Sequence, residues 1–403
     1  MKFLHTADIH LDSHKARIAH RNQAVDALLS DCTRQAFRNV IDQAITADVA
    51  FVLIAGDLYD GDWRDYGTGL FFAAEMRRLG RPCYIVQGNH DASSQITRTL
   101  QLPPNVHVFS ADTASVVELT EWAVAIHGQS FGTRAVAENL AEGYPDPVQG
   151  RFNIGVLHSS VEGSNDHDPY APCRLELLVN KGYDYWALGH VHTRATLHEF
   201  PHVHFPGNPQ GRHPREPGSR GATLVEVQDG RVLSMTYCAT DVVRWANVTV
   251  DANGAESMAE LSARMGLAMA IIRDQAEGRP VIARVTVSGT TPLHAMLSLD
   301  TDQLTAEARN AAASLGWDFH IERVRVDTQP PIDGVAALGP LEASFRAGLD
   351  DPDLIDELLK DFTRLRGAIP GGVDVAVPTT GAELAAMGAD AWQAVLHHLR
   401  GVA

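Results

Sequence analysis

The sequence predicts an α/β protein in which strands and helices alternate over most of the 403 residues. Short apolar runs rich in β-branched and aromatic residues, such as those at 51–54 and 185–188, indicate buried strands. Segments with apolar residues at helical spacing lie between them and indicate helices with one buried face. With 45% hydrophobic and 21% charged residues, the composition is that of a globular protein with a large core.

Residues 1–242 carry most of the predicted strands. Strands are expected at residues 1–4, 51–54, 83–86, 106–109, 122–126, 154–156, 185–188 and 222–227. A helix is expected at 27–47 and a shorter one at 70–79, and Gly80 and Pro82 end the second of them. Such alternation predicts sheets covered by helices.

The segment 243–328 repeats the alternation on a smaller scale. Strands are expected at 248–250, 281–287 and 319–326, with helices at 256–277 and 304–315. This βαβαβ pattern predicts a separate small α/β domain. Its position in the chain suggests a lid over a site in the preceding domain, although a structural appendage would give the same pattern.

The segment 329–403 opens with a Pro-rich linker and continues with helices. One helical segment is interrupted at Pro352, and another begins with the capping-box pattern Thr380-x-x-Glu383. Their apolar stripes include Phe345, Leu358, Phe362, Trp392 and Leu399. These helices could pack on the body of the protein or dock a partner.

Composition limits the classes of function. The formal net charge of −17 argues against a protein that coats DNA by bulk electrostatics, but not against a nuclease, because bound cations reverse the field of an acidic site. No apolar run approaches the ~20 residues of a membrane-spanning helix, and we expect no signal peptide. The scattered cysteines suggest buried thiols and a cytoplasmic location.

Polar motifs follow five of the predicted strands directly. They are Asp8-Ile9-His10, Gly56-Asp57, Gly88-Asn89-His90-Asp91, Leu157-His158 and Gly189-His190-Val191-His192. Carboxylate, amide and imidazole groups delivered from strand ends to one place make a metal cluster. The groups are too many for one ion, and a carboxylate can bridge two. The sequence therefore predicts a two-metal site for attack on a phosphate ester.

These motifs, in this order, resemble the calcineurin-like metallophosphoesterase superfamily. The runs Asp8-Ile9-His10-Leu11-Asp12 and Gly56-Asp57-Leu58-Tyr59-Asp60 resemble the SbcD-type exonuclease subunits, and residues 205–213 resemble bacterial YhaO-type members. The resemblance implies two packed mixed sheets flanked by helices, with the metals at one edge. It also implies three parts: a metallophosphoesterase (nuclease) domain at 1–242, an α/β capping domain at 243–328, and a linker with a C-terminal helical, partner-binding segment at 329–403.

The resemblance also implies roles for single residues. Asp8, His10 and His192 would hold the first metal, Asn89, His158 and His190 the second, and Asp57 would bridge both. His90 would act on the scissile phosphate as the catalytic residue. Substrate contacts are expected from Asp60, Gln210, Arg212 and His213. Asp60 stands where archaeal and eukaryotic relatives carry a phosphate-contacting histidine, and residues 210–213 could instead form a loop that supports His190 and His192.

The predicted function is that of a two-metal-dependent DNA phosphodiesterase, a 3′-to-5′ exonuclease subunit of a DNA repair complex. Mn²⁺ is the expected metal, with iron or zinc as alternatives. The resemblance implies DNA and a coiled-coil ATPase of the SbcC or YhaN type as partners, is compatible with a homodimer, and implies no membrane. The alternative is a stand-alone small-phosphoester or nucleotide phosphodiesterase. A third interpretation, an interaction protein with a structural metal site, does not explain His90.

Overall fold

The computed structural model describes residues 1–13, 23–61, 66–93, 101–161, 171–316, 318–331, 339–368 and 377–400. The chain forms two compact units. The first comprises Met1–Asn247, Ile272–Ala283 and Trp317–Glu322. The second comprises Val248–Ile271, Arg284–Gly316 and Arg323–Ala403. Each unit is described by itself.

The first unit contains a six-stranded sheet in the order β12-β11-β1-β2-β3-β4. Its strands are β1 (Lys2–Thr6), β2 (Phe51–Ala55), β3 (Cys83–Val86), β4 (Val106–Val108), β11 (Gly221–Gln228) and β12 (Arg231–Ala239). Strands β1 to β4 pair in parallel, whereas β11 and β12 are antiparallel. The carboxyl ends of β1, β2 and β3 therefore lie at the same edge of this sheet.

A second six-stranded sheet has the order β5-β6-β7-β8-β10-β9. Its strands are β5 (Ser115–Leu119), β6 (Val124–Gly128), β7 (Phe152–His158), β8 (Tyr185–Gly189), β9 (Ala195–Glu199) and β10 (His202–Phe205). The central strands pair in parallel, and β5 and β9 close the sheet with antiparallel pairs. Every residue of β7 and β8 is buried, because both faces of this sheet are covered.

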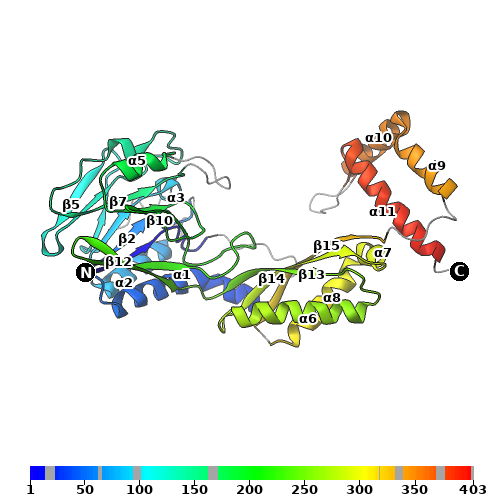
Figure 1. Ribbon diagram of the computed structural model, residues 1–403, viewed down its shortest axis with the longest axis horizontal. Helices are drawn as coiled ribbons and strands as arrows, with labels where there is room; N and C mark the ends of the chain where they lie inside the picture. Colours follow the sequence, from blue (N-terminus) through cyan, green and yellow to red (C-terminus); the bar gives the residue numbers. More distant parts are fainter. Residues whose placement is uncertain are drawn as a thin grey trace. The chain divides into compact units, whose positions relative to one another are not determined.

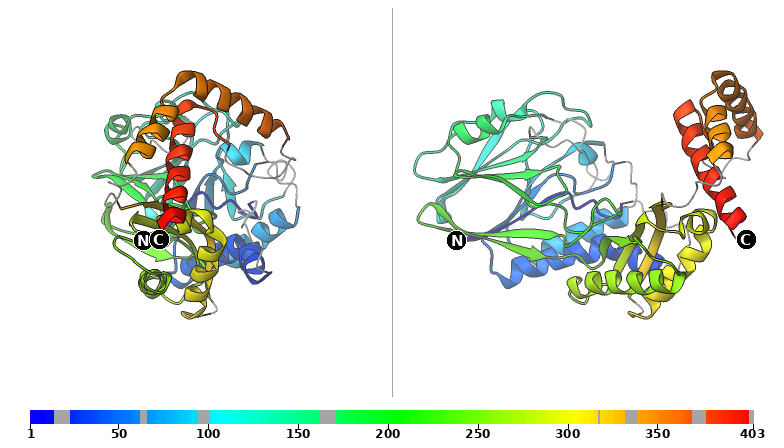
Figure 2. Two further views of the ribbon diagram at one scale, coloured as in Figure 1. Left: turned by 90° about the vertical axis from the view of Figure 1, so that its right-hand side faces the viewer. Right: turned by 45° about the vertical axis from the view of Figure 1, so that its right-hand side comes forward.

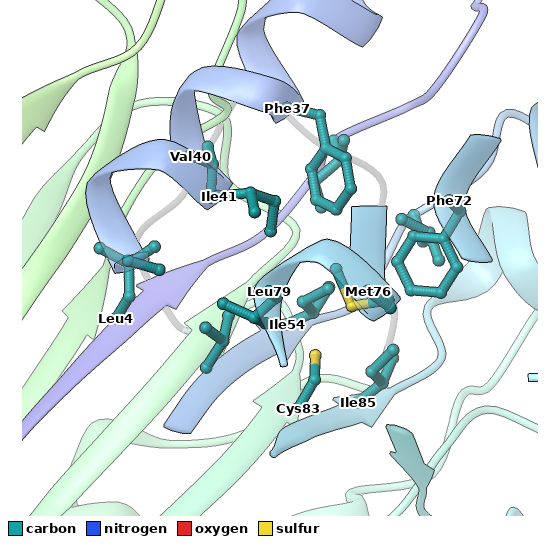
Figure 3. Close-up of a cluster of buried hydrophobic side chains, with 14 of the residues drawn as sticks. Leu4, Phe37, Val40, Ile41, Ile54, Phe72, Met76, Leu79, Cys83 and Ile85 are labelled. Atoms are coloured by element: carbon teal, nitrogen blue, oxygen red, sulfur yellow. The ribbon is translucent and has the colours of Figure 1, made fainter. Parts of the chain in front are cut away.

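Helices cover the outer faces of the two sheets (Figure 1). Helices α1 (Gln23–Thr46) and α2 (Tyr66–Leu79) pack Phe37, Ile41 and Met76 against the first sheet, as Figure 3 shows. The short helix α5 (Leu175–Asn180) covers the second sheet, where Leu178 packs near Trp186. The layers are thus helix, sheet, sheet, helix, which confirms the predicted fold class.

Aromatic side chains fill the space between the two sheets. The ring of Phe3 stacks on Phe51 at 5.2 Å and meets the ring of Tyr185 edge-on at 5.3 Å. These residues belong to a buried cluster that joins β1 and β2 with β7 and β8. Because the sheets pack face to face, motif residues at the ends of strands in both sheets come close together.

The predicted strand and helix order after residue 243 is also found. Strands β13 (Arg244–Asp251), β14 (Val281–Thr290) and β15 (Phe319–Gln329) form a three-stranded sheet. Helices α6 (Met258–Gln275), α7 (His294–Leu299) and α8 (Thr301–Ala313) connect them in the sequence. The residues before Val248 cluster with the first unit. The domain boundary at 243 stays a prediction.

The C-terminal helices lie within the second unit, where α9 (Gly339–Leu349), α10 (Pro352–Ala368) and α11 (Gly381–Arg400) pack against one another (Figure 2). The rings of Phe345 and Trp392 stack at 5.2 Å, and α11 also contacts α7. The predicted cap forms, since the hydroxyl oxygen of Thr380 accepts from the backbone N–H of Glu383 at 3.3 Å. The side chain of Leu399 lies outside the described residues.

Helix α10 keeps an apolar stripe that the described residues do not bury. Leu354 and Leu365 are exposed, and Phe362 is half-buried. The helices therefore pack partly on their own unit and partly present apolar surface. Among the described residues, no helix combines the length and the hydropathy that a membrane crossing requires.

Candidate metal centre

The motif residues meet where the parallel strands of the two sheets end. Strand β2 packs against both β7 and β8, which brings the loops after these strands to the loop after β1. Among the residues that the structure describes, three groups of side chains have ligand atoms within 4.8 Å of one another. They are Asp8, His10 and His192; Asp8, Asp57 and His158; and His10, Asp60 and His90. Asn89 and His190 adjoin them, so all seven predicted ligands come together.

Two histidines of the first predicted metal group point at each other. Nε2 of His10 lies 3.3 Å from Nε2 of His192, and their rings are nearly perpendicular. Asp8 is held beside them, because both of its carboxylate oxygens lie 3.0 Å from the backbone N–H of His190. A cation placed among these atoms would be bound by two imidazole nitrogens and a fixed carboxylate.

One oxygen of Asp57 faces both predicted metal groups. Its Oδ2 atom lies 3.5 Å from Nε2 of His158 and 3.8 Å from Nε2 of His10. Its Oδ1 atom accepts the backbone N–H of His90 at 3.0 Å, so the carboxylate cannot rotate freely. Asp57 is 2% exposed. This is the placement that a bridging carboxylate needs.

In the second predicted metal group, two atoms that both carry lone pairs lie next to each other. Nδ1 of His158 donates to the carbonyl oxygen of Ala55 at 2.9 Å, so a neutral ring leaves its Nε2 without a proton. That Nε2 lies 3.1 Å from Oδ1 of Asn89, which is also an acceptor. A cation between the two would satisfy both, and the donor set therefore fits a metal ion.

The charges of the site fit a metal as well. Burial raises the pKa of Asp8, and the nearby charge of Asp57 raises it further. Burial also raises the pKa of Asp57 and lowers the pKa of His158 to about 3. Two buried carboxylates side by side need positive charge, and the histidines supply none when neutral. A pair of divalent cations would provide that charge.

The backbone is strained where the predicted ligands lie. Asp8, His10, Asp57 and His190 have φ values of 53°, 46°, 53° and 104°. Residues with a Cβ rarely adopt positive φ, and each such residue costs about 1–3 kcal/mol. Strain of this kind gathers at functional sites, because the surrounding fold holds the residues in place for another purpose.

Gly88 allows the backbone to approach the bridging carboxylate. A Cβ atom at this position would overlap Oδ1 of Asp57. The overlap comes from the close approach, since Gly88 is not among the glycines with positive φ.

We expect Gly88→Ala to displace Asp57 and to weaken metal binding about 10- to 100-fold, the range found when support for a ligand is lost. Manganese titration of the purified variant by calorimetry measures the effect. Gly143→Ala is the matched control, because a Cβ atom there meets nothing within 4 Å. Equal affinities for the two variants would contradict this account of Gly88.

Asp60 lies behind two histidines of the site. Its Oδ1 is 3.1 Å from Nδ1 of His90 and 3.3 Å from Nδ1 of His10. Burial lowers the pKa of the His90 imidazole, but the hydrogen bond to Asp60 and the charge of Asp57 outweigh it, and the net shift is upward. Asp60 is therefore placed to hold these rings, and its predicted contact with substrate stays a prediction.

The loop after β10 contains the other predicted substrate contacts. Gln210 is 1% exposed, and its amide donates to the carbonyl oxygens of Gly211 and Val243. This geometry favours the alternative interpretation, a loop that supports the site. Nη2 of Arg212 lies 3.3 Å from Nδ1 of His192, at the edge of the site. His213 lies 3.5 Å from Glu216 and is about one-third exposed.

Two acidic residues of the site have roles that were not predicted from the sequence. Asp91 accepts the backbone N–H groups of Leu58, Tyr59 and Gly88, and burial raises its pKa to about 7. It thereby ties the loop after β2 to the loop after β3. Glu216 lies 2.7 Å from Nδ1 of His192. Asp91 belongs to a predicted motif, but no sequence signal indicates that it binds backbone N–H groups, and nothing in the local sequence pairs Glu216 with His192.

Family models match two parts of the chain. The model described as calcineurin-like phosphoesterase matches residues 1–194. The model described as the middle domain of metallophosphoesterase YhaO matches residues 245–329. Together they cover the motif-bearing region and the three strands β13, β14 and β15.

Curated relatives agree with these matches. The uncharacterized metallophosphoesterase YhaO of Bacillus subtilis is 36% identical over 299 residues, which are 72% of each chain. The DNA double-strand break repair protein Mre11 of Methanopyrus kandleri is 24% identical over 66% of this chain and 62% of its own length. The protein of the same name from Sulfolobus acidocaldarius is 23% identical over 60% of this chain and 64% of its own length. The chain therefore belongs to the YhaO family of calcineurin-like metallophosphoesterases, and it is a metal-dependent phosphoesterase.

Proposed function

We propose that the protein is a two-metal DNA phosphodiesterase, and specifically a 3′-to-5′ exonuclease subunit of a DNA repair complex. The observation that carries the proposal is the single oxygen of Asp57 that faces both ligand groups, with His90 beside it. The similarity to two archaeal DNA double-strand break repair proteins supports DNA as the substrate. The match covers less than two thirds of the length of those relatives, so we carry their activity over to this chain only by analogy.

In this proposal Asp8, His10 and His192 would hold one ion and Asn89, His158 and His190 would hold the other. Asp57 would help to hold both, since its Oδ2 atom faces both ligand groups. When bound, two divalent ions activate a water nucleophile and stabilise the charge that develops on the phosphate. The mixed carboxylate, amide and imidazole ligands suit manganese.

His90 would protonate the leaving oxygen. Its Nδ1 faces Asp60 at 3.1 Å, which leaves Nε2 as the atom that can donate to substrate. The carboxylate of Asp60 stabilises the protonated ring and fixes its orientation, as acid catalysis requires. About one-third of the His90 side chain is exposed, so a substrate can reach it.

The proposal is tested on linear duplex DNA labelled at either end, with manganese, beside a small chromogenic phosphodiester. We expect mononucleotides to be released from 3′ ends. Release from 5′ ends would contradict the proposed polarity. Hydrolysis of the small diester without any action on DNA would favour the alternative, a stand-alone small-phosphoester hydrolase.

Activity should fall at acid pH, and manganese should oppose the fall. Burial raises the pKa of Asp8 and Asp57 in the metal-free form, so these carboxylates take up protons before an exposed aspartate would. Protonated ligands do not bind metal, and affinity therefore decreases as pH falls. Rates measured against pH at two manganese concentrations should show the acid limb moving to lower pH with more metal. If the pH of this decline does not change with manganese concentration, the titrating group lies outside the metal ligands.

We further propose that segment 243–328 is a capping domain and that segment 329–403 binds a coiled-coil ATPase. The partly exposed apolar stripe on α10 supports the second part. An amphipathic helix with such a stripe commonly docks in a groove of another chain.

Replacing Leu354 and Leu365 with Glu should abolish copurification with the ATPase and any ATP-stimulated action on DNA. Hydrolysis of a small diester should be unchanged, since both leucines are already exposed. Leu299→Glu, on α7, is a matched control at another exposed leucine. Retained association would place the partner elsewhere, and loss of metals in the double variant would show that α10 belongs to the core.

A further inference from the structure

Glu216 lies behind the first ligand group and contacts one of its histidines. Its Oε1 atom is 2.7 Å from Nδ1 of His192, the nitrogen on the far side of the ring from the site. The carboxylate is buried, with 5% of the side chain exposed. The contact joins the motif after β8 to a residue of the loop between β10 and β11.

Both oxygens of Glu216 have further donors, which fix the carboxylate. Oε2 accepts the backbone N–H of Arg212 at 2.7 Å and Nδ2 of Asn208 at 3.0 Å. Oε1 also accepts Nη2 of Arg212 at 3.2 Å. A carboxylate bound by four donors has one orientation, and it can impose that orientation on the ring of His192.

The shorter of two contacts at Nδ1 decides which nitrogen of His192 carries the proton. Oε1 of Glu216 lies 2.7 Å from Nδ1, whereas Nη2 of Arg212 lies 3.3 Å away and also donates to Oε1. A neutral imidazole has one N–H, and a carboxylate at Nδ1 favours the proton there. Nε2 then keeps its lone pair, and this is the atom that lies 3.3 Å from Nε2 of His10. The ring is therefore arranged to bind a cation through Nε2.

The two ligand groups are supported by different acceptors. The Nδ1 atom of His158, in the second group, donates to the neutral carbonyl oxygen of Ala55. The Nδ1 atom of His192 faces a negative carboxylate, which raises the basicity of the opposite nitrogen more than a carbonyl does. Removing the carboxylate should thus affect the first group selectively.

We infer that Glu216 is a positioning residue for the first metal: it fixes the tautomer and orientation of His192 and thereby tightens metal binding at that group. This inference rests on the proposed function for the location of the first metal. It does not depend on DNA as the substrate. Loss of Glu216 should weaken the first ion about 10- to 100-fold and leave the second unchanged.

The test uses the full chain, stripped of metal and titrated with Mn²⁺ by calorimetry and electron paramagnetic resonance. Wild type should give two binding constants, and His158→Asn assigns the one that belongs to the second group. In Glu216→Gln, which has nearly the same shape, the other constant should weaken 10- to 100-fold. Glu226→Gln is the matched control, because Glu226 pairs with Lys2 at the opposite end of β1.

A second measurement separates positioning from loop support. Histidine ¹⁵N spectra of the metal-free protein report the tautomer, with His192→Asn used to assign the signal. The Nδ1–H form should dominate in wild type and be lost in Glu216→Ala; if that variant does not fold, Glu216→Gln and Glu216→Asp provide the comparison.

Equal weakening of both constants, no change in either, or an unchanged His192 tautomer would overturn the inference. A wild type that binds two ions but does not cleave DNA would contradict the proposed function alone.

Discussion

Asp57→Asn is expected to reduce metal-dependent phosphodiester hydrolysis by about 10³-fold or more while the fold remains intact. The metals supply several kcal/mol of charge stabilisation, and each ~1.4 kcal/mol corresponds to tenfold in rate. Asp57 is the residue whose single oxygen faces both ligand groups, so the neutral amide should impair both. Rates with saturating manganese and metal content of the purified variant measure the effect.

The control for this variant is Asp229→Asn. Asp229 is exposed, and its φ of 50° is close to the 53° of Asp57, so the same chemical change is made at a similar positive φ. The control should retain wild-type rate and metal content. Near-normal turnover of Asp57→Asn at saturating manganese would refute the bridging assignment.

His90→Ala should keep both ions and lose about 10²- to 10⁴-fold in rate on DNA, the usual contribution of general acid catalysis. The loss should depend on the leaving group. The alkoxide that leaves from DNA needs a proton, whereas nitrophenolate does not. Hydrolysis of bis(p-nitrophenyl) phosphate should therefore suffer much less than hydrolysis of DNA.

Metal analysis distinguishes this role from ligation. Loss of one ion in His90→Ala would make His90 a ligand. An equal loss of rate on both substrates would show that His90 does not act as the general acid. His107→Ala, at an exposed histidine within β4, is the control for the substitution itself. Asp60→Asn should also lower the rate on DNA, though less than His90→Ala, because the carboxylate of Asp60 lies 3.1 Å from Nδ1 of His90.

The sequence was most informative where buried strands end. The apolar runs at 51–54 and 185–188 lie within β2 and β8, and the polar motifs after them meet in the structure. Parallel strands deliver their carboxyl ends to one edge, so order along the chain was enough to predict convergence. Strands β5, β9 and β12 were missed because their side chains are mostly half-buried or exposed and form no continuous apolar run.

Side-chain partners could not be predicted in the same way. Glu216 reaches His192 only because of the path taken by the intervening loop, which no periodicity encodes. Asp60 belongs to a recognisable motif, but whether it faces the substrate or the rings of His10 and His90 depends on the turn at the end of β2. Gln210 is likewise fixed by the backbone around Val243, far along the chain. These side-chain partners depend on tertiary structure and cannot be predicted from the spacing of residues in the sequence.

The left-handed backbone of Asp8, His10, Asp57 and His190 bears on how the protein is maintained in a cell. Strain of about 1–3 kcal/mol at each is a sizeable part of the stability of an ordinary domain. Ions that bind only the folded chain offset it by mass action. Metal scarcity would then lower the amount of folded protein as well as its turnover. Substitutions that relax the backbone at these positions would stabilise the metal-free chain but weaken metal binding. High stability and high activity therefore favour different residues at the same four positions.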